Sequence, residues 1–313
     1  MDAIHVPEYG GPEVLELVDV EIPDPDDGEV RIDVRAAGVN FADIEKRRGN
    51  YPDGPTPPYR PGMEVAGVVE ATGSGTDLAA GDRVAALTSS GGYAEYTVVS
   101  TDTIVPYPER LSFASGTALP VQWLTAHNVL FEWGGLRSGE RVLITAGAGG
   151  VGTAAVQLAA TAGATVIAAA SSEEKRDLVR DLGANRAVEY SAIDDISVDL
   201  ALDGVGGRTF TDAVKALVPG GRIVTYGMAS GRVPTVATPR LFFQNKSVVG
   251  YHLEEALERA PERVLSAIPE LVDSVSDNST EVVVGDTIPL PRASEAHRRL
   301  QQRESHGKLV LVP

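Results

Sequence analysis

The chain has 313 residues, of which 43% are hydrophobic and 23% charged, with a formal net charge of −17. This length predicts two domains with a sizeable core, and the acidic surface excludes nucleic acid as a favoured partner. Cysteine is absent, which excludes disulfides, thiolate zinc sites and a cysteine nucleophile. No apolar run reaches the length of a membrane helix, and no secretory leader is recognisable, so a cytoplasmic location is expected.

The charge balance also bears on the environment of the protein. Acidic residues outnumber basic ones by 44 to 27, and most of the basic residues are arginine. This composition resembles that of proteins from halophilic archaea, in which carboxylates hold water and cations while molar salt screens their mutual repulsion. The alternative is an ordinary acidic protein that gains nothing from salt.

The first 125 or so residues read as β-rich. Short alternating or apolar runs, bounded by glycine, proline and aspartate, predict strands within 28–40, 65–75, 81–87 and 93–100. The proline-rich stretch "YPDGPTPPYRPG" (51–62) between them is expected to be a loop.

From about Leu136 the rhythm changes to strands alternating with helices. Strands are predicted in "RVLITA", "TVIAAA", "VDLALDGV", "RIVTYG" and "SVVGYH", with helices over 150–162, 172–182 and 208–217. Such alternation is typical of βαβ units in a doubly wound parallel (Rossmann) sheet. A long helix over 253–273, a β-rich return, a short helix over 293–303 and a final strand follow. We therefore predict a nucleotide domain, 124–258, inserted in a β-rich domain formed by 1–123 and 259–313.

A glycine-rich motif follows the first strand of the predicted nucleotide domain. Gly147, Gly149, Gly150, Val151 and Gly152 fall in a G-x-G-x-x-G pattern with a strand before it and a helix after it. Glycines there allow a tight turn and a close approach of a pyrophosphate to the main chain at a helix N-terminus. The alternative is a glycine-rich turn that binds nothing.

The end of the second strand indicates which dinucleotide is bound. NAD sites place a carboxylate there, about 20 residues after the glycines, whereas this chain has Ser171 and Ser172, followed by Lys175. Hydroxyl groups with a cation suit a 2′-phosphate, so NADPH is favoured. Glu173 and Glu174 argue against this, but they fall at a helix start, where they serve the helix dipole.

Over essentially its whole length the sequence resembles the zinc-independent quinone oxidoreductases, the zeta-crystallin-like branch of the medium-chain dehydrogenase/reductase superfamily. The motifs "AAGVNFADIEKRRGNYP", "PGMEVAGVV", "GDRVAAL", "GGYAEYTVV", "GAGGVGTAAVQLA", "DGVGG" and "GRIVTYG" occur in family order. The resemblance implies a GroES-like catalytic domain around the nucleotide domain. It also implies a homodimer formed through the edge strand near "SVVGYH".

The same resemblance bears on metal. Zinc alcohol dehydrogenases of the superfamily have a cysteine and a histidine where this chain has Asn40 and Met63, neither of which is an expected zinc ligand. The cysteine-rich structural zinc lobe is missing as well. No metal is therefore expected, and Glu64 is expected to be structural.

The resemblance also implies residue roles. Asn40 and Tyr51 are expected at the reaction site as hydrogen-bond or proton donors, the alternatives being a loop-capping asparagine and an aromatic lid. Gln122 and Thr125 are expected beside the nicotinamide. Further cofactor contacts are implied at Tyr190 (or plain core packing), Tyr226, Gly227, Gly250, Tyr251, Asn245 and Lys308.

The predicted activity is NADPH-dependent hydride transfer to quinones or to activated C=C bonds beside a carbonyl. An enone or enoyl-thioester reductase is the nearest alternative, although an acidic surface suits a phosphate-bearing thioester less well. A non-catalytic NADPH-binding protein is the alternative from another class.

Overall fold

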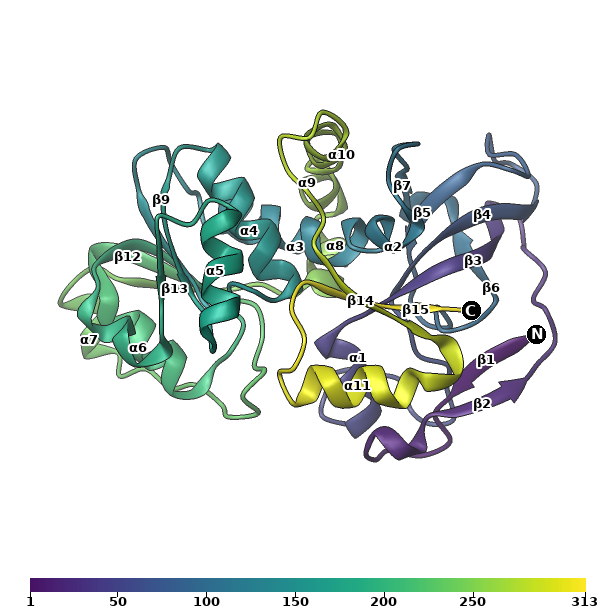
Figure 1. Cartoon of the computed structure of the whole chain (residues 1–313), viewed down its shortest axis with the longest axis horizontal. Coiled ribbons are helices and arrows are strands. Elements are labelled where there is room, and N and C mark those ends of the chain that lie inside the picture. Colours follow the sequence, from purple (N-terminus) through teal and green to yellow (C-terminus); the bar gives the residue numbers. More distant parts are fainter. The chain divides into compact units, whose positions relative to one another are not determined.

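The computed structural model describes all residues, 1–313, and the chain forms two compact units (Figure 1). Unit 1 comprises Met1–Val121 and Val282–Pro313, and unit 2 comprises Gln122–Glu281. The return to unit 1 therefore comes at Val282, later than the predicted 259. The reason is that the segment after 253 packs in unit 2, where the Asn128 side chain donates a hydrogen bond to the Val264 carbonyl at 3.2 Å.

Unit 2 is built on a six-stranded sheet in the order β10-β9-β8-β11-β12-β13, and every neighbouring pair is parallel. The strands are β8 (Arg141–Ile144), β9 (Thr165–Ala169), β10 (Arg186–Val188), β11 (Val198–Asp203), β12 (Leu217–Thr225) and β13 (Ser247–Gly250). The connecting helices are α4 (Gly150–Thr161), α5 (Glu173–Asp181) and α6 (Gly207–Ala216). The order reverses between β8 and β11, as the predicted doubly wound sheet requires.

Apolar strand composition explains why this sheet forms. Val142, Leu143 and Ile144 of β8 are fully buried, as expected of a central parallel strand covered by helices on both faces. Helix α4 is equally buried along Thr153–Ala159. Its small side chains let it pack close to β8 and β9, which it contacts.

The predicted long helix over 253–273 is wrong. Three short helices replace it: α8 (Leu253–Arg259), α9 (Pro261–Leu265) and α10 (Ile268–Ser276). Pro261 and Pro269 lie in the first turns of α9 and α10. Proline lacks a backbone N–H and clashes with the preceding turn, so each proline starts a new helix rather than continuing the old one.

Gln157 on α4 holds the last residue of unit 2. Its side-chain nitrogen donates to the Glu281 carbonyl at 2.9 Å, and its oxygen accepts from the Glu281 N–H at 2.8 Å. The amide thus pairs with Glu281 as a peptide unit of a neighbouring strand would. The chain consequently leaves unit 2 from a fixed position.

Unit 1 is built on a mainly antiparallel sheet in the order β14-β15-β3-β4-β5-β7, with β6 also paired to β3. Its strands are β3 (Glu29–Val39), β4 (Glu64–Thr72), β5 (Arg83–Leu87), β6 (Tyr96–Ser100), β7 (Ile104–Pro106), β14 (Val284–Pro289) and β15 (Lys308–Val312), beside a separate pair, β1 (Asp2–His5) and β2 (Glu16–Asp19). Helix α1 (Phe41–Arg48) follows β3 directly and contacts α11 (Ala293–Gln301) (Figure 1). Helix α2 (Phe113–Gly116) completes the unit.

No helix in the chain combines the length and the apolar character needed to cross a lipid bilayer.

Candidate functional site

The glycine turn of unit 2 connects β8 to α4. Ala146 adopts a left-handed conformation with φ +50°, and the chain then closes tightly on itself. A Cβ atom at Gly152 would overlap the Ala146 carbonyl and lie 2.7 Å from Gly147 Cα, and one at Gly147 would lie 2.9 Å from Ala168 Cβ. Both positions therefore lack room for a side chain, Gly152 because of the backbone of the turn and Gly147 because of the Ala168 side chain.

The N-terminus of α4 is suited to an anion. Helix α4 begins at Gly150, its N-cap Gly149 has no side chain, and its first turn holds no acidic residue. The first N–H groups of a helix have no intrahelical partner, and the helix dipole places partial positive charge there. A diphosphate group fits this main-chain cradle.

Gln122 lies directly against the glycine turn. A Cβ atom at Gly150 would overlap the Gln122 amide group, so the third glycine makes room for this side chain. Gln122 and Thr125 are 8% and 7% exposed and lie on successive turns, Leu119–Trp123 and Leu124–His127 (α3). The motif alone assigned Gly150 to the cofactor and missed this contact.

Tyr190 supports the glycine turn from below. Its hydroxyl oxygen accepts a hydrogen bond from the Ala146 N–H at 3.2 Å, which helps to hold the left-handed residue in place. The role on the adenosine side of the cofactor that the resemblance implies stays a prediction.

Asp203 joins the carboxyl ends of β8 and β11. One carboxylate oxygen accepts from the Thr145 hydroxyl at 3.0 Å and the other from the Gly206 N–H at 2.9 Å. Desolvation by burial raises the pKa of Asp203 despite these bonds. Tyr226, just after β12, packs over Gly204, where a Cβ atom would lie 2.9 Å from the ring. Sequence reasoning missed Asp203, whose only signal is an aspartate ending an apolar strand.

The three residues predicted to bind the 2′-phosphate follow β9. Ser171 and Ser172 are exposed and Lys175 is half-buried. Ser172 is the N-cap of α5, and its hydroxyl oxygen accepts from the Lys175 N–H at 3.3 Å. The Glu173 carboxylate forms an ion pair with Arg176 of the same helix, with 2.7 Å between the nitrogen and the oxygen.

The last strand of the sheet brings Gly250 and Tyr251 to the same carboxyl edge. The Tyr251 N–H donates to the Thr225 carbonyl at 2.9 Å. The Tyr251 ring packs in a T-shaped arrangement with the Trp133 ring, and the two ring centres are 4.9 Å apart. Gly227 is exposed after β12 at this edge.

Asn245 does not join these residues. It is exposed in a left-handed turn with φ +52° before β13 begins at Ser247. Doubly wound sheets bind ligands outside the carboxyl ends of their strands, and Asn245 lies at the amino end. Its predicted cofactor contact is not supported by this position.

Unit 1 contains a buried cluster of Asn40, Glu64 and Lys308, which we call the amide–ion cluster. The Lys308 ammonium bonds the Glu64 carboxylate, and both side chains are fully buried. Lys308 also donates to the Asn40 side-chain oxygen at 3.0 Å, while the Asn40 nitrogen donates to Glu64 at 2.7 Å. Lys308, predicted as a cofactor contact, is in this structure an internal partner of Glu64 and Asn40.

A second buried network adjoins this cluster through Asp43. The Asp43 carboxylate accepts from the Asn40 N–H at 2.8 Å and from the Tyr93 hydroxyl at 3.1 Å. The Tyr93 oxygen lies 3.2 Å from His297 Nε2, and Arg47 lies 3.4 Å from His297 Nδ1. Desolvation raises the pKa of Asp43 to about 6 and lowers the pKa of His297 to about 3.

Tyr51 lies in the turn after α1, on the same side as Asp43. The Lys46 ammonium sits 5.0 Å from the centre of the Tyr51 ring, and Lys46 lines a small recess together with Asp43 and Met63. Three of the predicted reaction-site features, Asn40, Tyr51 and the methionine in place of histidine, thus belong to one end of unit 1.

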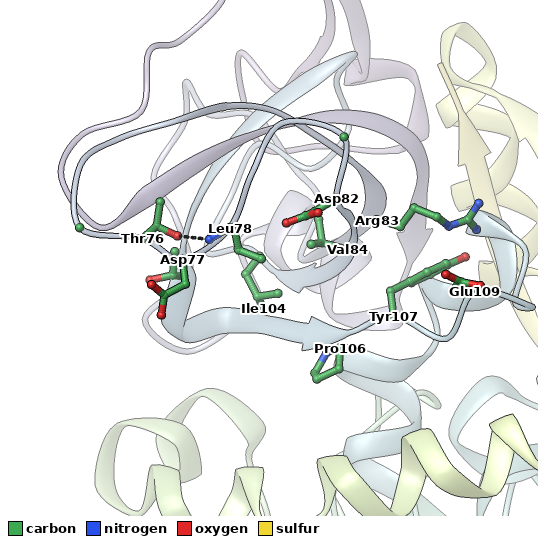
Figure 2. Close-up of a pocket in the computed structure, with 13 residues that line it drawn as sticks. Thr76, Asp77, Leu78, Asp82, Arg83, Val84, Ile104, Pro106, Tyr107 and Glu109 are labelled. Carbon is green, nitrogen blue, oxygen red and sulfur yellow. Dashed lines mark hydrogen bonds between the residues drawn. The ribbon is translucent and has the colours of Figure 1, made fainter.

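A larger hollow of about 740 Å³ occurs elsewhere in unit 1 (Figure 2). Leu78, Val84, Ile104 and Tyr107 line it together with Asp82. It lies beyond the end of β4 at Thr72, whereas Glu64 and the amide–ion cluster are at the start of that strand. The hollow contains none of the predicted site residues and is not the candidate site.

Comparison with known proteins gives the class first. Residues 26–109 match the alcohol dehydrogenase GroES-like domain, and residues 150–270 match the zinc-binding dehydrogenase family. Together with the parallel sheet of unit 2 and the β-rich unit 1, these matches define a two-domain medium-chain dehydrogenase/reductase and confirm the predicted fold class.

Similar individual proteins identify the family more narrowly than the domain matches do. Mouse quinone oxidoreductase is 35% identical over 329 residues, covering 100% of this chain and 98% of that protein. The rat synaptic vesicle membrane protein VAT-1 homolog is 33% identical, covering 93% of this chain and 78% of that protein. This chain belongs to the quinone oxidoreductase-like medium-chain dehydrogenases/reductases.

Two solved structures carry a cofactor. *Escherichia coli* quinone oxidoreductase complexed with NADPH matches with a TM-score of 0.93 at 29% identity, covering 100% of both chains. A mycobacterial protein complexed with NADPH also has a TM-score of 0.93, at 34% identity and 100% coverage of both chains.

Proposed function

We propose that this protein is an NADPH-dependent oxidoreductase that reduces quinones or activated α,β-unsaturated carbonyl compounds. The observation that carries the proposal is the glycine turn, in which Gly147, Gly150 and Gly152 have no room for a Cβ atom and which leads into an α4 N-terminus with no acidic residue in its first turn. The NADPH complexes of two similar structures support it.

The residues present fit this cofactor. Main-chain groups of Gly147–Gly152 would hold the diphosphate, and Ser171, Ser172 and Lys175 would face the 2′-phosphate. Gly250, Tyr251 and Thr225 meet at one edge, where the backbone would hold the carboxamide, with Thr125 near the nicotinamide. When bound, NADPH supplies a hydride. The chain's own task is to orient the rings, exclude water and stabilise charge on the acceptor oxygen.

Asn40 and Tyr51 are the proposed donors to that oxygen. The Asn40 amide nitrogen is a hydrogen-bond donor whose direction is set by Glu64. Tyr51 has its ring under the Lys46 ammonium, 5.0 Å from the ring centre, and its phenol hydroxyl can donate a proton. One side chain is thus suited to stabilising a developing oxyanion, the other to delivering a proton.

We also propose that the reaction uses no zinc. Zinc requires cysteine, histidine or carboxylate ligands. At the corresponding positions this chain has an asparagine, a methionine and Glu64, whose carboxylate is already bonded to the Lys308 ammonium. This set does not fit a zinc ion, and no step is derived through one.

The test is turnover with a panel of quinones, enones and enoyl thioesters, each with NADPH and NADH, in high salt. We expect NADPH oxidation with 9,10-phenanthrenequinone or an enone, and loss of turnover but not of NADPH binding in Asn40→Ala. NADPH binding without turnover on any acceptor would favour the non-catalytic alternative. Absence of NADPH binding would overturn the proposal.

The halophilic origin is a separate proposal that rests on the net charge of −17. If it is correct, the melting temperature rises as KCl is increased to molar concentration, because screening weakens repulsion among the carboxylates. A melting temperature that does not rise with KCl would refute it. The cytoplasmic location remains a prediction.

We further propose a homodimer through the edge strand β13. Val248 on this strand is 37% exposed, and the preceding Phe242 and Phe243 are 60% and 79% exposed. An open strand edge beside exposed aromatic side chains is prone to pair with another chain. Light scattering should give twice the chain mass, and Val248→Lys should give a monomer. A monomeric wild type would refute the dimer.

A further inference from the structure

We propose that the buried Lys308–Glu64 ion pair is a positioning device that fixes the direction in which the Asn40 amide group faces. The inference rests on the proposed function, in which Asn40 serves the acceptor oxygen. It concerns the hydrogen-bonding chemistry of three residues from β15, β4 and the turn after β3.

The donor and acceptor properties of the partners permit only one orientation of the amide. An ammonium group can only donate, so Lys308 must face the Asn40 oxygen, which lies 3.0 Å away. A carboxylate can only accept, so Glu64 must face the Asn40 nitrogen, at 2.7 Å. Rotating the amide by half a turn would bring oxygen to carboxylate and nitrogen to ammonium, with both contacts repulsive.

Hydrogen bonds to neighbouring groups hold the ion pair in position. Lys308 gives its three hydrogens to Glu64, to Asn40 and to the Val39 carbonyl at 3.3 Å. The second Glu64 oxygen accepts from the Val121 N–H at 2.9 Å. Because both groups are fully buried, no water competes for these bonds, and each charge has its complement of partners.

Gly38 provides the space for this arrangement. A Cβ atom there would lie 2.5 Å from Lys308 Cε and 2.7 Å from Glu64 Cγ. Gly38 is on β3, paired with Val310 of β15, so the strand that ends just before Asn40 also leaves the room in which the pair forms. The device is thus built into the sheet rather than into a loop.

Either ion alone is sufficient to set the amide direction, and this makes a sharp experiment possible. Lys308→Met leaves Glu64 facing the Asn40 nitrogen, and Glu64→Gln leaves Lys308 facing the Asn40 oxygen. The double variant removes both ionic constraints, because glutamine can present either its oxygen or its nitrogen to Asn40. It leaves only the contact of the Asn40 side chain with the Asp43 backbone in the α1 capping box, which carries no full charge. The double variant also contains no unpaired buried charge.

We expect stability and turnover to move in opposite directions. Each single variant should melt well below the wild type but keep kcat, per folded molecule, within about threefold. The double variant should regain most of the melting temperature while kcat falls about tenfold or more, since misorientation of a reacting group lowers the rate by one to two orders of magnitude.

If kcat follows the melting temperature across the three variants, the pair is merely structural and the proposal is overturned. Arg259→Met, at the exposed ion pair with Glu255, is the matched control and should leave both the melting temperature and kcat unchanged.

A readout without turnover separates this proposal from the proposed function. The ¹⁵N signal of the Asn40 side-chain amide, assigned by its loss in Asn40→Ala, should be single in the wild type and exchange with solvent far more slowly than that of exposed Asn245. In the double variant it should shift or split, because both orientations become populated. Wild-type exchange as fast as that of Asn245, or an unchanged signal in the double variant, would overturn the orienting role even if the enzyme turns over. Lack of turnover with these signals as expected would overturn only the proposed function.

Discussion

The glycine turn of unit 2 and the amide–ion cluster of unit 1 prepare polar groups by opposite means. The turn relies on main chain: its glycines carry no side chains, the backbone closes on itself at Ala146 and Gly152, and the first N–H groups of α4 have no partner within the helix. The cluster relies on side chains with full charges, buried and mutually satisfied. A main-chain site tolerates no added atom, whereas a charged cluster tolerates no lost partner.

The largest effect is expected at the turn. In Gly152→Ala the new Cβ atom meets the Ala146 carbonyl and Gly147. Overpacking of this kind costs ~1–3 kcal/mol, so NADPH binding should weaken by up to about 100-fold. The dissociation constant of NADPH is measured by fluorescence titration of the reduced cofactor with the protein. Thr161→Ala, on the exposed end of the same helix, is the control. Equal affinities for Gly152→Ala and the wild type would show that the turn does not hold the cofactor.

The cluster should respond through stability instead. In Gly38→Ala the Cβ atom presses on Lys308 and Glu64, and we expect the free energy of unfolding to fall by ~1–3 kcal/mol. Urea denaturation checks this, with NADPH affinity of the folded protein expected to stay at the wild-type value. A variant as stable as the wild type would mean that the pair has room to shift.

Lys175 tests the one place where the main-chain site uses a charged side chain. Lys175→Ala removes the ammonium group. This should weaken the binding of NADPH by about tenfold and leave the binding of NADH nearly unchanged, because only NADPH carries the 2′-phosphate. Dissociation constants for both cofactors give the answer, with Lys215→Ala as a lysine control. Equal losses for the two cofactors would remove Lys175 from the phosphate site.

An effect that is absent at neutral pH and grows on acidification concerns the network beside the cluster. Because native His297 has a pKa of about 3, the unfolded chain alone takes up a proton at this side chain as pH falls below 6.5. Through this residue, the free energy of unfolding therefore falls by up to ~1.4 kcal/mol for each pH unit of acidification between pH 6.5 and 3. The stability advantage of wild type over His297→Gln should shrink as pH falls from 7 to 4, measured by denaturation at each pH. A difference independent of pH would show that native His297 accepts a proton readily.

Local patterns predicted the main-chain site well and the charged cluster poorly. The strand–turn–helix rhythm and the glycine spacing are contained in a few consecutive residues, so the parallel sheet and the turn could be predicted. Asn40, Glu64 and Lys308 were each singled out, but not their mutual contacts, because nothing in sequence spacing joins positions so far apart. The contacts among Asp43, Tyr93 and His297 were not predicted either, for the same reason.

The prediction of one long helix over 253–273 is wrong because Pro261 and Pro269 each start a new helix, a local signal that outweighs the apolar pattern. The cofactor contact that the resemblance implies for Asn245 stays a prediction. The position of this residue before the amino end of β13 depends on where the preceding turn closes, which the sequence does not mark.

The pairing of Gln157 with Glu281 has a consequence for engineering the chain. Since the amide binds both backbone groups of Glu281, this residue is locked in register with α4. A peptide tag or a fused domain inserted before Glu281 would have to break these two hydrogen bonds. One inserted between Val282 and β14 would displace Val283, whose carbonyl accepts a hydrogen bond from the Lys308 N–H at 2.8 Å. Neither side of Glu281 is therefore a suitable point at which to graft a reporter or to split the polypeptide.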